Sequence, residues 1–342
     1  MKTLLLHLLL STSALATGAA PSPVVIAHRG ASGYLPEHTL PSVAYAHALG
    51  ADYLEQDIVL SKDRVPLVLH DIEIDTVTDV ATRFPGRQRA NGHFYAIDFT
   101  LAEIRQLRAH ERCDPKTGRP VYPRRFPIGQ STFAVPTLEE ELQFIQGLNR
   151  STGRDTGIYP EIKAPAWHRA QGHDISAIVL EVLARYGYRT KADNFYLQCF
   201  DFAEVQRLRR ELGFQGKIVQ LVGRYGAGEN EQAATDDARD NSDLLAPARL
   251  AEVARYADGI GPSLAHLVAV DATGHAQPND VVARAHALGL VVHPYTFRTD
   301  ALPKFSSDAR ALLSLLFGEL RVDGIFADQP DVVRAYRQGY SR

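Results

Sequence analysis

Charged side chains lie two residues apart in two apolar segments of this chain. Glu55 and Asp57 form one pair, and Glu161 and Lys163 form the other. Side chains two apart in a β-strand point to the same face, so each pair is expected to converge on one side. Burying carboxylates without partners is costly, and a divalent cation would remove that cost. The all-oxygen set Glu55, Asp57 and Glu161 suits Ca²⁺ or Mg²⁺, and no Cys or His cluster has the spacing of a zinc site.

Two histidines at the ends of predicted strands, His28 and His70, have the pKa range needed for proton transfer near neutral pH. One could take a proton from an attacking oxygen while the other gives one to a leaving alcohol. Arg29, next to His28, offers a planar fork for a phosphate, and Lys163 adds a second positive charge. The three carboxylates, a divalent cation, these two basic groups and one phosphodiester sum to zero charge, which favours a phosphodiester substrate.

The attacking oxygen is expected to come from water or from the substrate, because the chain has no G-x-S-x-G nucleophile pattern. Two other functions stay open. A glycosidase on the same scaffold would use two of the carboxylates as acid and nucleophile, but it would leave both histidines, Arg29 and Lys163 without a role. A catalytically silent binding protein is the other alternative, although a disused site should show gaps in its motif.

Length and composition indicate an ordinary folded protein of 342 residues. Apolar residues make up 45% of the chain and charged residues 23%, which excludes a disordered or polytopic membrane protein. The 37 Lys and Arg nearly balance the 40 Asp and Glu. Nucleic-acid binding requires a concentrated basic surface, so we expect no nucleic-acid partner. Nothing in the sequence indicates the oligomeric state.

Short apolar segments rich in Val, Ile and Tyr alternate with longer amphipathic ones, a pattern typical of strand-helix repetition. The strand candidates are 24–28, 53–59, 66–70, 157–163, 195–200, 217–222, 258–262, 290–297 and 322–328. The link between the second and third is too short for a parallel crossover, so these two strands are expected to form an antiparallel hairpin. Asp57 would then lie roughly opposite His70. The sequence thus predicts an α/β fold, a (β/α)8 TIM barrel, with a doubly wound open sheet as the alternative.

Helix signals lie between the strands, and one long segment departs from the repetition. Thr137 with Glu140 and Asp201 with Glu204 have capping-box spacing, and residues 278–289 and 330–338 have helical periodicity. Residues 72–156 fit the repetition poorly and contain one predicted helix near 100–109. Within this segment, 83–125 carries ten Lys or Arg against four Asp or Glu. We interpret 72–156 as an insertion after the third strand.

Residues 1–20 have the features of a secretory signal: Lys2, a short apolar run, and small residues at two candidate cleavage sites. The apolar run is too short to span a bilayer. No Cys lies near the predicted cut, so no stable membrane anchor is expected. Residues 21–342 would then form the mature barrel, located in the periplasm or secreted.

The sequence resembles the exported bacterial glycerophosphodiester phosphodiesterases over nearly the whole mature chain. The segments that carry the resemblance are IAHRGASGYLPEHTLPSVAYAHALGADYLEQDIVLSKD, LVLHD, YPEIKAP, YLQCFD, YADGIGP and VVHPYTFR, in this order. The resemblance implies a (β/α) barrel with an insertion after the His70 strand and Ca²⁺ as the usual metal. It also implies hydrolysis of glycerophosphodiesters to sn-glycerol 3-phosphate and an alcohol.

The matching motifs imply a role for each candidate residue. His28 and His70 match the catalytic pair, Glu55, Asp57 and Glu161 match the metal ligands, and Arg29 and Lys163 match the phosphate contacts. The family's chemistry suggests that the glycerol 2-hydroxyl attacks phosphorus, with one His as base and the other as acid. His38 stands where many relatives have Asn, and its role is open. Gln198, Phe200 and Tyr295 lie near strand ends and are predicted to shape the glycerol or alcohol pocket, although such aromatic residues also suit a core.

Overall fold

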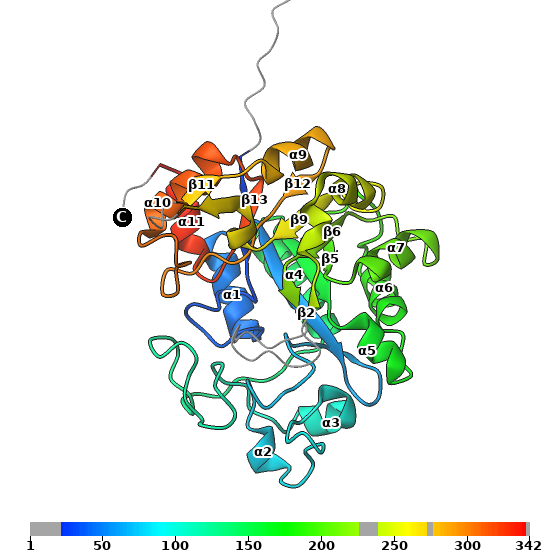
Figure 1. The fold of residues 1–342 in the computed structure, drawn as a ribbon. Helices are drawn as coiled ribbons and strands as arrows, with labels where there is room; N and C mark the ends of the chain where they lie inside the picture. Colours follow the sequence, from blue (N-terminus) through cyan, green and yellow to red (C-terminus); the bar gives the residue numbers. More distant parts are fainter. Residues whose placement is uncertain (1–21, 226–238, 272–275, 340–342) are drawn as a thin grey trace, which may run out of the picture.

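Eight parallel strands form a nearly closed barrel in this computed structural model, which describes residues 22–225, 239–271 and 276–339 (Figure 1). In chain order they are β1 (Val24–Ala27), β2 (Tyr53–Leu60), β4 (Gly157–Ile162), β5 (Leu197–Cys199), β6 (Ile218–Val222), β9 (Gly259–Pro262), β12 (Val291–Val292) and β13 (Gly324–Ala327). Their order in the sheet is β12-β9-β6-β5-β4-β2-β1-β13. The edge strands meet where the Asp323 N–H donates to the Val292 carbonyl at 3.0 Å. The predicted barrel is confirmed, and the open-sheet alternative is wrong.

The third strand candidate, 66–70, forms the predicted hairpin with the second. β3 (Pro66–Val68) pairs antiparallel with β2, and the Ser61 N–H closes the turn by donating to the Val65 carbonyl at 3.0 Å. The Leu69 N–H donates to the Asp57 carbonyl at 2.8 Å, so Asp57 lies opposite Leu69 and His70 is one residue further along. The hairpin therefore brings His70 to the edge of the barrel interior.

Alternation along each strand separates an outer apolar face from a mixed interior. Leu54 and Ile58 of β2 belong to the main apolar core under the helices. Glu55 and Asp57 alternate with these residues along β2, so their side chains face the barrel interior. Deeper in the interior, an apolar cluster of Ile26, Tyr159, Val219 and Phe326, with Tyr53 and Tyr196 packed against it, fills the space between the strands. This cluster closes the floor beneath the polar groups.

Helices form a layer outside the strands (Figure 1). They are α1 (Leu40–Leu49), α4 (Leu138–Thr152), α5 (Pro165–Ala170), α6 (Ile175–Arg185), α7 (Phe202–Arg210), α8 (Pro247–Val253), α9 (Val281–Ala287), α10 (Ala309–Ser314) and α11 (Pro330–Arg337). Two small hairpins, β7 (Arg224–Tyr225) with β8 (Arg239–Asp240) and β10 (Val268–Val270) with β11 (Ala276–Pro278), lie off the barrel. No helix in the described ranges is long and apolar enough to cross a membrane.

The helix signals in the sequence are mostly confirmed. Thr137 and Glu140 form both bonds of a capping box at the start of α4, and the Asp201 side chain accepts from the Glu204 N–H at the start of α7. The predicted helices over 278–289 and 330–338 correspond to α9 and α11. The helix predicted near 100–109 is wrong in length. Only α3 (Leu101–Ile104) forms there, because Ala109 continues in extended conformation and pairs with Phe133.

Residues 72–136 lie beside one end of the barrel, drawn in cyan to green in Figure 1. This segment contains α2 (Val80–Arg83) and α3. Its apolar side chains, which include Ile74, Phe99 and Phe133, form one cluster with Val59, Leu67 and Leu69 of the β2–β3 hairpin. The last part of the predicted 72–156 insertion does not join this cluster. It forms α4, whose apolar face belongs to the main core of the barrel. Hereafter "the insertion" means residues 72–136. The predicted signal segment 1–20 lies outside the described residues.

A carboxyl group is buried between α4 and β2. Glu141 has no exposed surface, and the Gln56 side chain donates to its Oε1 at 3.0 Å. Burial raises the pKa of Glu141 to about 8. At Glu141 the folded state thus binds more protons than the unfolded state between pH 4.5 and 8, so the contribution of this group to stability falls as the pH rises through that range.

Glu141→Gln is expected to remove this pH dependence. The free energy of unfolding of the variant, minus that of the parent protein, should grow by on the order of 4 kcal/mol from pH 4.5 to pH 9. Urea denaturation at both pH values measures the difference. A difference that is the same at both values would contradict the assignment of a neutral Glu141 in the folded protein.

Candidate active site

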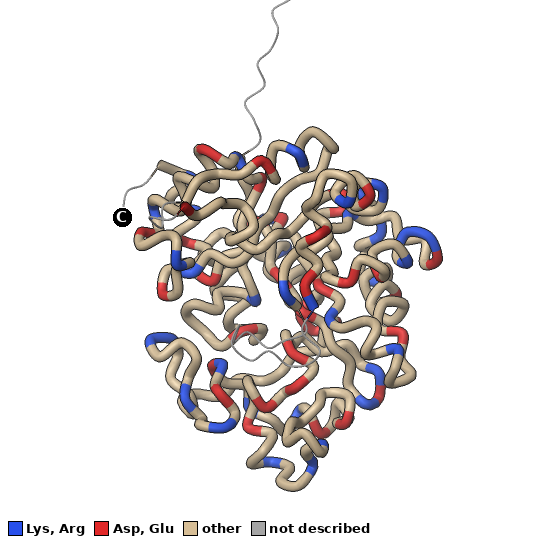
Figure 2. Tube along the Cα trace, viewed as in Figure 1, with Lys and Arg blue, Asp and Glu red and all other residues tan. Residues whose placement is uncertain are grey.

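Three carboxylates of β2 and β4 meet inside the barrel. Glu55, Asp57 and Glu161 each place an oxygen within 4.8 Å of the others. Asp57 and Glu161 are direct partners in the register of the two strands. All three are buried. Figure 2 shows acidic and basic positions close together in this part of the molecule. The sequence-predicted oxygen cluster is therefore assembled, and it could bind a metal ion.

Without a bound cation, the pKa values of the acidic triad Glu55, Asp57 and Glu161 are shifted in different directions. Burial, and then the charge of Asp57, raise the pKa of Glu55 well above its usual range. Burial also raises the pKa of Glu161 to about 8. Burial alone would raise the pKa of Asp57 too, but Lys163, with His70 and His38, holds it well below its usual range. A bound cation would favour the ionised form of all three groups.

His28 follows β1 and is held by an aspartate from the opposite end of the chain. Its Nδ1 lies 2.6 Å from Oδ1 of Asp328, and its Nε2 lies 3.8 Å from Oε2 of Glu55. An ionised Asp328 accepts the proton of Nδ1, which leaves Nε2 on the side of the triad as the proton acceptor. Burial, and then Arg29, lower the pKa of His28 to about 4.

His70 follows β3 and repeats this arrangement with its neighbour in sequence. Its Nδ1 lies 2.6 Å from Oδ1 of Asp71. Burial, and then Arg29 and Lys163, lower the pKa of His70. The negative charge of Asp57 acts in the opposite direction and raises the pKa of this imidazole. Both predicted catalytic histidines thus border the acidic triad, each oriented through Nδ1 by an aspartate.

The two predicted phosphate contacts also reach the triad. Arg29 has a φ of +57°, a left-handed conformation in which its N–H donates to Oε2 of Glu55 at 2.8 Å. The Arg29 Nε lies 3.4 Å from Oδ2 of Asp57. The Lys163 ammonium lies 2.8 Å from Oε1 of Glu161 and 3.6 Å from Oδ1 of Asp57. Burial alone would lower the pKa of Lys163, but these carboxylates raise it. Two fixed positive charges therefore stand beside the carboxylates.

Gly30 allows the sharp turn that follows Arg29. Its φ is +78°, and a Cβ at this position would lie 2.6 Å from the hydroxyl and 2.9 Å from the backbone carbonyl carbon of Ser42. A larger residue would force the β1 loop away from α1. The glycine thus helps to fix the backbone that presents Arg29.

The three residues predicted to shape the substrate pocket have different surroundings. Gln198 is buried and donates to Oε1 of Glu55 at 3.0 Å, so it orients a carboxylate of the triad. The Phe200 ring lies 5.9 Å from the Lys163 ammonium and packs edge-on against Tyr295. The Tyr295 hydroxyl donates to the Val222 carbonyl at 3.1 Å. Phe200 therefore lies beside a basic group of the site, whereas Tyr295 packs against the Phe200 ring.

Comparison with known proteins agrees with this geometry. Residues 28–332 match the model of the glycerophosphoryl diester phosphodiesterase family. The chain belongs to this family. It is 43% identical to a glycerophosphodiester phosphodiesterase of Haemophilus influenzae over 92% of this chain and 90% of that protein. It is 39% identical to one of Treponema pallidum, over 94% and 93% of the two chains.

A solved structure of a Silicibacter pomeroyi protein shares the fold. Its TM-score is 0.66 at 26% sequence identity, and the match covers 94% of this chain and 96% of that chain. Both the strand pairing in this chain and the similarity to a solved structure therefore indicate the barrel fold.

Asp328, Asp71 and His38 contact the predicted site residues of this phosphodiesterase family member, and none of them was assigned a role from the sequence. Asp328 and Asp71 orient the two histidines. His38, with a φ of +57°, places Nε2 at 2.8 Å from Oδ2 of Asp57. The signal for Asp71 was its place next to His70. Asp328 had a weaker signal, because it ends the last strand, where polar side chains of a barrel gather.

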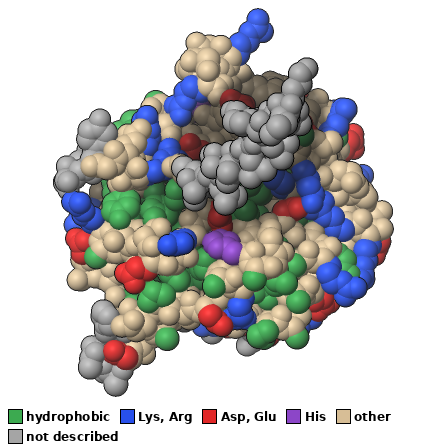
Figure 3. Space-filling view, turned by 90° about the horizontal axis from the view of Figure 1, so that it is seen from above, with side chains coloured by type: hydrophobic (Ala, Val, Ile, Leu, Met, Phe, Trp, Pro, Cys, Tyr) green, Lys and Arg blue, Asp and Glu red, His purple; other side chains and the backbone are tan. Residues whose placement is uncertain are grey.

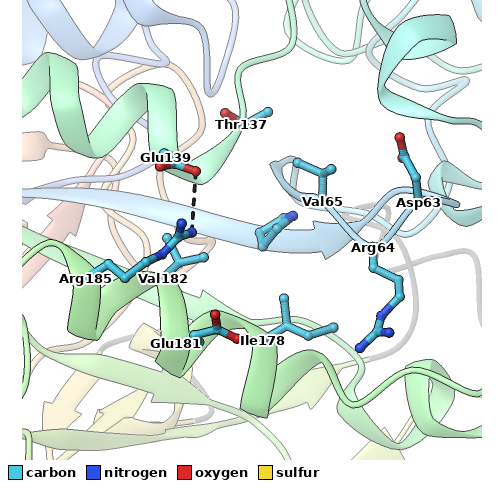
Figure 4. Close-up of a pocket in the computed structure, with 10 residues that line it drawn as sticks. Asp63, Arg64, Val65, Thr137, Glu139, Ile178, Glu181, Val182 and Arg185 are labelled. Atoms are coloured by element: carbon cyan, nitrogen blue, oxygen red, sulfur yellow. Dashed lines mark hydrogen bonds and ion pairs between the residues drawn. The ribbon is translucent and has the colours of Figure 1, made fainter.

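A pocket elsewhere on this family member contains none of these groups. It has a volume of about 390 Å³ and lies between the β2–β3 turn, the start of α4, and α6 (Figure 4). Its one marked ion pair joins Arg185 to Glu139, in which both side chains are about half exposed (Figure 4). On the face shown in Figure 3, charged and hydrophobic side chains are intermixed. The buried triad and its histidines are thus the better candidate for catalysis.

Proposed function

We propose that this protein hydrolyses glycerophosphodiesters to sn-glycerol 3-phosphate and an alcohol. Membership in the family and the names of its two bacterial relatives support this activity. The observation that carries the proposal is the pair of histidines beside the acidic triad, each bonded through Nδ1 to an aspartate. A glycosidase would have no use for these two imidazoles.

The proposed mechanism divides the work among the chain's own residues. Arg29 and Lys163 bind the phosphate oxygens and offset their charge. One imidazole takes the proton of the glycerol 2-hydroxyl as its oxygen forms a bond to phosphorus. The other gives a proton to the alkoxide as the bond between phosphorus and the alcohol oxygen breaks. Water then opens the resulting cyclic phosphate, with the two histidines in reversed roles.

We propose Ca²⁺ as the metal. The donor set fits a hard cation, because Glu55, Asp57 and Glu161 supply only carboxylate oxygens. Oδ1 of Asp57 is buried and has no hydrogen-bond partner within the described residues, as expected of a ligand atom. When bound, the cation would neutralise phosphoryl charge and help to orient the attacking hydroxyl. Mg²⁺ shares the preference for oxygen ligands and is the alternative ion.

We also propose that the chain is exported and works in the periplasm or outside the cell. The support is the sequence of residues 1–20, with its positive start, short apolar run and small residues near the cut. Small-molecule glycerophosphodiesters are the partners that this location and the site favour.

The activity is tested by an assay of the purified mature protein on glycerophosphocholine. We expect equal amounts of sn-glycerol 3-phosphate and choline, measured by separate enzymatic assays or by chromatography. Release of phosphocholine and glycerol would contradict the proposed bond cleavage. The absence of any turnover, with binding retained, would favour the silent binding protein instead.

A diester built on propane-1,3-diol, which is glycerol without its 2-hydroxyl, tests the role of that hydroxyl. This substrate has no hydroxyl on the carbon next to the esterified one and so lacks the proposed nucleophile. We therefore expect its kcat to be at least ~10²-fold lower than that of the glycerol diester, as for the loss of an intramolecular attacking group. Steady-state kinetics of the two diesters with the same alcohol provide the comparison. Equal rates would indicate direct attack by water.

A further inference from the structure

Two buried arginines extend from the insertion into the active site. Arg112 and Arg125 are 3% and 4% exposed at their side chains, although the segment around them is rich in basic residues on the surface. Neither was assigned a role from the sequence. Each contacts an aspartate that orients a catalytic histidine.

Arg112 completes the group around His70. Its NH1 donates to Oδ2 of Asp71 at 2.5 Å, while Oδ1 of the same carboxylate faces the His70 Nδ1 at 2.6 Å. The remaining nitrogens of Arg112 donate to Glu37 at 2.7 and 3.0 Å, and Glu37 in turn accepts from Arg29. Arg112 thus links His70 to a predicted phosphate contact.

Arg125 completes the group around His28 in the same manner. Its NH2 donates to Oδ2 of Asp328 at 2.7 Å, and Oδ1 of that carboxylate faces the His28 Nδ1 at 2.6 Å. Arg125 also donates to both oxygens of Asp300, at 2.8 and 3.1 Å. Arg298 of the barrel contacts the same Oδ2 of Asp328 at 2.8 Å.

The two groups share one design. In each group, Oδ1 of the aspartate faces an imidazole, and Oδ2 accepts a hydrogen bond from an arginine of the insertion. A buried carboxylate with only one oxygen compensated would be costly and could rotate or take up a proton. Burial alone would raise the pKa of Asp71, but Arg112 and His70 hold it well below its usual range. Burial alone would likewise raise the pKa of Asp328, but Arg298 and His28, and then Arg125, hold it well below its usual range. The arginines of the insertion therefore help to keep each aspartate ionised and in one orientation.

We propose that the insertion is a working part of the active site, in which Arg112 and Arg125 position His70 and His28 through Asp71 and Asp328. This inference rests on the proposed phosphodiesterase function. It gives the insertion a role in catalysis in addition to any role in substrate access. Both arginines are positioning residues, since they act on the substrate through another side chain.

The test combines arginine variants with double-mutant cycles. Arg112→Gln and Arg125→Gln should each lower kcat for glycerophosphocholine at least ~10-fold, the usual cost of losing a group that orients a functional side chain. In an Asp71→Asn background, Arg112→Gln should have little further effect, and likewise Arg125→Gln in Asp328→Asn. A merely structural arginine would instead give the same fold loss in both backgrounds.

Arg105→Gln is the matched control. Arg105 also joins the insertion to the barrel, through Glu140 of α4 at 2.7 Å, but it contacts neither aspartate. Its kcat should equal that of the parent protein. If a glutamine variant fails to fold, as judged by circular dichroism and thermal melting, Arg112→Lys and Arg125→Lys replace it, and they too should lower kcat while retaining more activity than Gln would.

The outcomes separate the two proposals. An inactive parent protein would overturn the phosphodiesterase function itself. An active parent whose folded Arg112 and Arg125 variants keep kcat within twofold, or whose losses add fully to those of the aspartate variants, would overturn the role of the insertion alone.

Discussion

Replacing His28 or His70 with alanine is expected to lower kcat for glycerophosphocholine by at least ~10²-fold, as for the loss of a general acid or base. Each imidazole is fixed through Nδ1 by an aspartate, so Nε2 is the atom left for proton exchange with substrate. The remaining histidine cannot replace the missing one, because the two lie on different strands and are held by different aspartates. Steady-state kinetics measure the loss, and circular dichroism checks the fold.

His286→Ala provides the control for the histidine variants. His286 lies on α9 and is paired with Asp323 at 2.9 Å, outside the group around the triad. Its substitution should leave kcat unchanged. A near-normal rate for a folded His28 or His70 variant would remove that residue from the proposed mechanism.

Removal of divalent ions is expected to abolish activity, and added Ca²⁺ is expected to restore it. Without a cation, burial favours the protonated forms of Glu55 and Glu161, whose pKa values are raised. Binding of Ca²⁺ should therefore release protons and, because the ion binds the folded state, raise the melting temperature. Turnover, proton release and thermal melting provide three independent measurements.

Glu161→Gln separates the metal site from nonspecific effects of the chelator. This variant keeps the size of the side chain but removes one charged ligand, so it should need a higher Ca²⁺ concentration for both turnover and thermal stabilisation. Full activity of the parent protein in excess chelator would refute the metal assignment. Equal recovery with Mg²⁺ would show that the site accepts either ion.

The strands and the core chemistry could be predicted because their signals are local. Apolar segments identified all nine strands of the barrel sheet, and the short link between the second and third identified the hairpin. Spacing of two predicted that Glu55 and Asp57 share a face, and parallel register then placed Glu161 beside Asp57. Alternation and register repeat along a strand, so a sequence pattern can reveal them.

Local sequence patterns failed to predict two features of the fold: the length of the helix near 100–109 and the end of the insertion. Helix α3 begins with a capping box but ends after one turn. Ala109 then pairs with Phe133, a contact that local periodicity cannot predict. Residues 138–152 follow an irregular segment, yet they form α4 and pack in the main core. Burial against distant elements decided both cases.

The sequence by itself determined which chemical groups stand at the ends of the barrel strands, since residue type and strand alternation are written into each segment. Only the tertiary structure decided how those groups are held. Asp328 reaches His28 across 300 positions of the chain, and Arg125 reaches Asp328 across 203. Such pairs arise because closing the barrel and docking the insertion bury several charges together, and buried charges must find partners wherever the fold brings them within reach.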